Sequence, residues 1–117
     1  MTTDSPLRSR LRAALLEARR ARDPATVSTL RTALSALENA EAVPDDGPAA
    51  GALEQAPLGA GATEARRRVL TDADERALLD AEIASLHEAE QAYADAVPER
   101  AAAAQRAATV LADLRDA

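Results

Sequence analysis

Apolar side chains recur every three to four residues in four stretches of the chain, which is the period of an amphipathic helix. The first such stretch predicts a helix over residues 6–22. Its start is marked by Ser5 and Pro6, because serine caps helix ends and proline fits the first helical position. The apolar stripe of this helix consists of Leu7, Leu11, Leu15 and Ala18.

A second helix is predicted over residues 24–42, directly after Asp23 and Pro24, which repeat the start signal of the first helix. The connection between the two helices is very short, which favours an antiparallel helical hairpin. The stripe of the second helix consists of Val27, Leu30, Leu34 and Leu37.

Two further helices are predicted near the end of the chain, over residues 72–96 and 98–115. Thr71 and the acidic residues after it are typical of a helix start, where negative charge complements the helix dipole. Val97 and Pro98 interrupt the pattern and begin the last helix. The stripes are Leu79, Ile83, Leu86 and Tyr93 in the third helix, and Ala104, Ala107, Leu111 and Leu114 in the fourth.

The periodicity vanishes over residues 43–62, which hold all four glycines and three of the six prolines. This composition predicts a flexible linker. No stretch shows the sustained alternation of a strand. The sequence therefore predicts one all-α domain over residues 1–117, built as two antiparallel helical hairpins joined by a flexible loop.

The predicted core is thin, although 47% of the 117 residues are hydrophobic, because most of them are alanine. The chain has no Phe, no Trp and no Cys, so it lacks both large core anchors and disulfides. We expect a partner, or a second copy in a homo-oligomer, to supply additional burial. The lack of cysteine also excludes thiol chemistry and Cys-ligated zinc.

No segment approaches the roughly 18 consecutive apolar residues that span a bilayer, and the first residues lack the apolar stretch of a signal peptide. We therefore expect a cytoplasmic protein with no membrane contact.

No catalytic motif is visible, and we expect no catalytic residue, no metal site and no cofactor. The single histidine, His87, is predicted to lie solvated on the flank of the third helix. Glu90 falls within the apolar stripe of that helix, so we expect it to have an arginine partner.

The arginines form the most informative pattern. At about 100° per residue, four of them fall within an arc of about 80° around the axis of the first helix. A cluster of three more precedes the third helix. Such stripes bind phosphate groups, or they cover apolar surface and pair with acids on the third helix. Residues 1–40 carry a net charge of +3, whereas residues 41–117 carry −9, so both readings stay open. These arginines are Arg8, Arg12, Arg19, Arg22, Arg66, Arg67 and Arg68.

Residues 11–42 and 61–96 together resemble the YqeY-like family. The shared features are two helices joined by a turn with a basic residue and an aspartate, followed by an arginine-rich segment that leads into a helix with an acidic first turn. Arg22 and Asp23 match the turn, Leu30 and Arg31 match a pair in the second helix, and Glu41 matches the end of that helix. The resemblance adds Arg31 to the candidate phosphate or partner contacts. The resemblance covers only the N-terminal helical domain of that family, and we expect the helical tail domain that family members usually carry to be absent.

The resemblance implies a link to the tRNA-dependent amidotransferase, a carbon-nitrogen ligase with glutamine as amide donor, whose B subunit shares the tail domain of this family. Two functions follow as expectations. One is a non-catalytic accessory protein that contacts tRNA or an amidotransferase complex. The other is a helical protein–protein interaction module with no RNA role.

Overall fold

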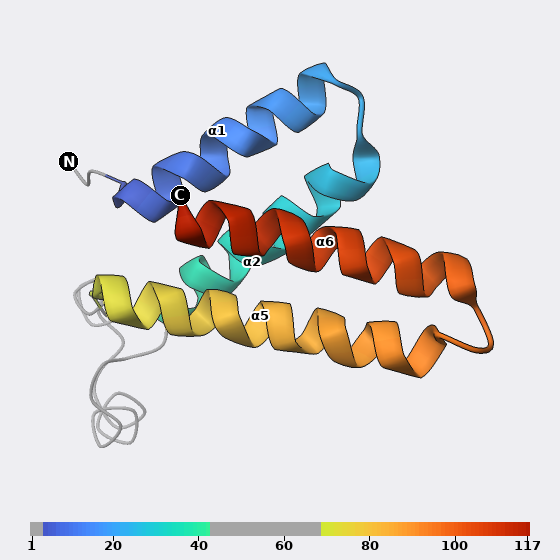
Figure 1. The fold of residues 1–117 in the computed structure, drawn as a ribbon. Helices are drawn as coiled ribbons and strands as arrows, with labels where there is room; N and C mark the ends of the chain where they lie inside the picture. The colour runs from blue at the N-terminus through green and yellow to red at the C-terminus, as the bar shows by residue number, and fades with distance from the viewer. Residues whose placement is uncertain (1–3, 43–68) are drawn as a thin grey trace, which may run out of the picture.

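A computed structural model describes residues 4–42 and 69–117, and all regular structure in these two ranges is helical (Figure 1). The predicted all-α class is confirmed. The helices are α1 (Pro6–Arg20), α2 (Pro24–Ala42), α5 (Asp72–Tyr93) and α6 (Pro98–Asp116). The predicted linker over residues 43–62 lies outside the described residues.

Local hydrogen bonds determine where the helices begin. The Ser5 hydroxyl accepts a hydrogen bond from the Arg8 backbone N–H at 3.1 Å and caps α1. Before α5, the Thr71 hydroxyl accepts from the Asp74 N–H, and the Asp74 carboxylate accepts in return from the Thr71 N–H. This reciprocal pair satisfies two backbone donors that have no partner inside the helix. The predicted first residues of α1 and α5 are therefore correct.

Two helices end earlier than predicted. Helix α1 ends at Arg20 rather than at residue 22, because the backbone of Arg22 turns into the left-handed region. Helix α5 ends at Tyr93 rather than at residue 96. Val97, which precedes Pro98, has φ of −137° and ψ of 74°, so its backbone lies outside the helical region that a following proline disfavours.

The two hairpins pack on each other through one shared core. Figure 1 shows α5 and α6 side by side, with α1 and α2 against the half of α6 that holds the C-terminus. Every helix contributes at least one leucine that is almost fully buried, and these side chains pack into a single cluster. They are Leu11 in α1, Leu30 and Leu37 in α2, Leu79 in α5 and Leu111 in α6.

In residues 4–42 and 69–117, no helix is both long enough and apolar enough to cross a bilayer.

Candidate functional site: an arginine-lined groove

The turn between α1 and α2 has a defined geometry. The Asp23 N–H donates to the Ala18 carbonyl at 3.0 Å, and the Arg22 N–H donates to the Arg19 carbonyl at 3.1 Å. This pattern closes a helix with one left-handed residue, which is usually glycine. Here that residue is Arg22, with φ of 56°. A residue with a β-carbon costs roughly 1–2 kcal/mol in this conformation, so the protein holds a strained arginine at this position.

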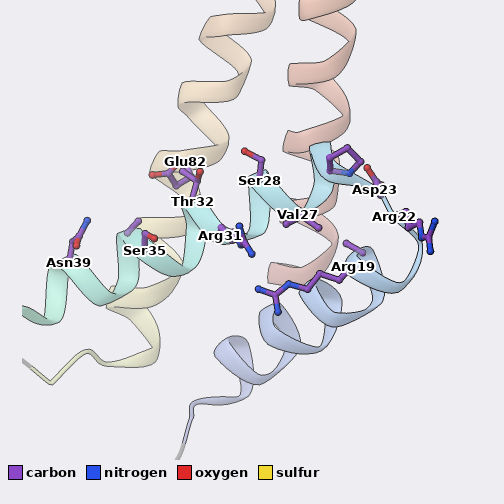
Figure 2. Close-up of a pocket in the computed structure, with 13 residues that line it drawn as sticks. Arg19, Arg22, Asp23, Val27, Ser28, Arg31, Thr32, Ser35, Asn39 and Glu82 are labelled. Atoms are coloured by element: carbon purple, nitrogen blue, oxygen red, sulfur yellow. The ribbon is translucent and has the colours of Figure 1, made fainter.

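The strained turn forms one end of a groove of about 850 Å³, which is lined mainly by α2, by the end of α1 and by Glu82 of α5. Figure 2 shows the groove residues, with the polar side chains of α2 following one another along that helix. Small apolar groups, hydroxyls and charged groups all contribute to the lining. The lining residues are Ala18, Arg19, Arg22, Asp23, Pro24, Val27, Ser28, Arg31, Thr32, Ser35, Ala36, Asn39 and Glu82.

Three arginines and two acids line the groove, and the acids are Asp23 in the turn and Glu82 of α5. Arg19, Arg22 and Arg31 are exposed, and none of them forms an ion pair within residues 4–42 and 69–117. The carboxylate of Asp23, in contrast, is already engaged by Thr26, whose N–H and hydroxyl both donate to it. Within the described part of the chain, three guanidinium groups of this surface are therefore not neutralised by an ion pair, and such groups bind anions well.

The sequence predicted a single arginine stripe on α1, but the structure divides it. The side chain of Arg8 is 13% exposed and pairs with Glu41 of α2 and Glu75 of α5. Burial alone would lower the pKa of Arg8, but hydrogen bonds to Glu41 and Glu75 outweigh it and raise that pKa further. Arg12 pairs with Asp4 at 2.7 Å and approaches Glu38 at 3.8 Å.

The arginines at the two ends of this stripe thus have different surroundings. Arg8 pairs with an acid on α5, which was one of the two alternatives that the sequence left open for these arginines. Arg19 and Arg22 instead line the groove, where Arg31 of α2 joins them. Figure 2 shows the Arg19 side chain extending from α1 toward the α2 side of the groove, whereas Arg22 points outward from the turn. Arg66, Arg67 and Arg68 lie outside the described residues.

The expectation for Glu90 was wrong. Its recorded contact is the Nδ1 of His87 at 3.4 Å, with 31% of the Glu90 side chain exposed. The buried acid of α5 is Glu75, whose side chain is 3% exposed. The sequence contained the signal for this residue, since Glu75 comes four positions before Leu79 and eight before Ile83, on the same helical face. His87 is 56% exposed, which agrees with the solvated position predicted for it.

The groove contains hydroxyl groups as well as charged groups. Its hydroxyls come from Ser28, Thr32 and Ser35, and the one histidine of the chain lies elsewhere, on α5. Within the described part of the chain, no group of three or more His, Cys, Asp or Glu side chains could hold a metal ion.

Comparisons with protein-family models, with curated proteins and with solved structures gave no match for this chain.

Proposed function

We propose that this chain is a non-catalytic helical accessory protein that binds tRNA through the phosphate backbone, in the groove between α1 and α2. The link to tRNA-dependent amidation, and to its carbon-nitrogen ligase, comes from the resemblance to the YqeY-like family. The groove adds a physical basis for RNA contact that does not depend on that resemblance.

One observation carries the proposal: Arg19, Arg22 and Arg31 line a common groove and have no ion pair within the described residues. Guanidinium groups bind phosphate through two parallel hydrogen bonds, so they are well suited to a nucleic-acid backbone. The strain at Arg22 supports the same use. A glycine would be more stable at this turn, and strained residues concentrate at binding sites.

The same groove supports recognition of the RNA backbone rather than of base sequence. Sequence-specific RNA contacts usually rely on aromatic side chains that stack on unpaired bases. The chain has no Phe or Trp, and its single tyrosine, Tyr93, is on α5 beneath Arg100, whose guanidinium carbon is 5.6 Å from the ring centre. We therefore expect weak sequence preference and strong dependence on salt.

The test is a titration of total tRNA into the full-length protein, followed by fluorescence anisotropy over a series of salt concentrations. We expect Arg19→Gln combined with Arg31→Gln to weaken binding and to reduce the slope of log K against log salt by about 2, since each phosphate contact contributes about 1.

The chain offers a matched control. Arg12→Gln combined with Arg20→Gln removes the same charge from exposed arginines that lie outside the groove and are paired with Asp4 and Glu17. The control variant should keep the slope of the wild type. Equal losses in both double variants would contradict a role for the groove, and no binding of tRNA at low salt would contradict the function as a whole.

A second candidate function is a helical protein–protein interaction module. The observation that favours it is the groove face of α2, which runs from Pro24 to Asn39 at helical spacing, over about four turns. An amphipathic helix of a partner fits such a face, with side chains spaced three and four residues apart as anchors.

A further inference from the structure

Charge is segregated between two helices of this protein. Helix α1 contains five arginines and one glutamate, whereas α5 contains seven acidic residues and one arginine. Within the described residues, the one ion pair that joins the two helices is that of Arg8 with Glu75. Most of the positive charge of α1 and most of the negative charge of α5 are therefore not neutralised by each other inside one molecule.

Helix α5 exposes a face made largely of small residues. Ala81, Ala84, Ser85, Glu88 and Ala92 are all exposed and recur at helical spacing, and Asp95 continues this face just past the end of the helix. Neither Glu88 nor Asp95 has a recorded ion pair within the described residues.

The groove is complementary to this face in size and charge. Ser28, Thr32, Ser35 and Ala36 provide small side chains along α2. Arg19 and Arg31 contribute positive charge to the same groove, and Glu82 of α5 lies beside Thr32. Small residues on both surfaces allow two helix backbones to approach closely, and opposite charges fix their register.

We infer that the groove of one copy holds α5 of a second copy, with Arg19 and Arg31 of one protomer facing Glu88 and Asp95 of the other. The inference does not rest on the proposed function, because it requires no RNA, and α5 of a second copy would compete with tRNA for this groove. Two such contacts related by a twofold axis form a closed dimer, in which each copy provides one groove and one helix. A dimer of this kind also buries surface that the thin, Ala-rich core of one chain cannot.

The experiment measures the solution mass of the full-length protein by light scattering, without RNA, at low and at moderate salt. We expect a dimer at low salt and a smaller mass at moderate salt, because exposed charge pairs are screened.

Two charge-reversed proteins then locate the contact. The first carries Arg19→Glu and Arg31→Glu, and the second carries Glu88→Arg and Asp95→Arg. All four positions are exposed, so the helical circular dichroism of the wild type should be retained. Each protein alone should be monomeric, because like charges would meet in both of its contacts. An equimolar mixture should form a heterodimer, because the acidic groove then meets a basic α5 and the basic groove meets an acidic α5.

Three outcomes would overturn the inference. One is a wild-type protein that stays monomeric at low salt. Another is a dimer that persists in either reversed protein. The third is a mixture of the two reversed proteins that fails to associate. A monomer that gains mass only when tRNA is added would exclude a second copy as the occupant and leave the proposed RNA binding intact.

Discussion

Arg8 and Glu75 lie 67 residues apart in the sequence, and the Arg8 Nε donates a hydrogen bond to the Glu75 Oε2 at 2.9 Å. Arg8 also pairs with Glu41, so one guanidinium connects α1, α2 and α5. The second oxygen of Glu75, Oε1, is buried without a hydrogen-bond partner among the described residues. The buried carboxylate of Glu75 therefore depends on Arg8 for its compensation.

Replacing Arg8 with methionine should destabilise the protein strongly. The change leaves Glu75 as an unpaired carboxylate at 3% exposure, and breaking a buried pair in this way costs about 3–5 kcal/mol. Urea unfolding followed by circular dichroism measures the effect. Arg20→Met is the control, since Arg20 is 68% exposed in its pair with Glu17 and surface pairs contribute about 0–1 kcal/mol.

The double change Arg8→Met with Glu75→Leu should recover most of the lost stability, because it removes the buried charge together with its partner. A double variant as unstable as Arg8→Met alone would show that the loss comes from the packing of the Arg8 side chain and not from the unpaired carboxylate.

Leu11→Ala and Leu16→Ala make the same chemical change on the same helix with different expected results. Leu11 is 0% exposed in the core, so its truncation should cost about 2–5 kcal/mol. Leu16 is 47% exposed, so its truncation should change the free energy of unfolding by no more than about 0.5 kcal/mol. Similar losses in the two variants would contradict the packing of α1 described above.

Arg22→Gly should raise stability and weaken tRNA binding at the same time. Glycine adopts positive φ without strain, so we expect a gain of about 1 kcal/mol in the free energy of unfolding. Arg22→Ala is the matched control, because it removes the same charge but keeps the β-carbon and the strain. It should weaken binding without the gain in stability. Unchanged tRNA binding in both variants would remove Arg22 from the binding site.

The capping of α2 by Asp23 should make stability depend on pH in the acidic range. The side-chain hydrogen bond from Thr26, followed by the one from its backbone N–H, lowers the pKa of Asp23 below its usual value of 3.8. A lowered pKa in the folded state stabilises the protein above pH 3.8, and this contribution is lost as the pH falls through the folded-state value. Melting temperatures measured from neutral to acidic pH should show this loss.

Asp23→Asn tests the assignment, because asparagine also caps helices but does not titrate. The variant should melt at a temperature close to that of the wild type at neutral pH and lose less stability on acidification. An acid dependence identical to that of the wild type would assign the effect to other carboxylates.

The helices and their first residues could be predicted from the sequence because they depend on groups within four positions of each other. The cap of Ser5 on Arg8 and the reciprocal pair of Thr71 and Asp74 are bonds of this kind. The stripes of Leu11, Leu30 and Leu79 likewise follow from the helical period alone. Even the burial of Glu75 follows from its spacing to Leu79. The acid expected in the apolar stripe with an arginine partner was instead Glu90.

The use of each arginine was decided only by the tertiary structure. Helical periodicity predicts that Arg8, Arg12, Arg19 and Arg22 share one side of the first helix, but it does not show which of them meets an acid from another helix. The packing of the two hairpins brings Glu75 to Arg8 and leaves Arg19 and Arg22 beside a groove with Arg31. The physical reason is range: helix periods and caps act over one turn, whereas ion pairs and grooves depend on how segments distant in sequence pack together.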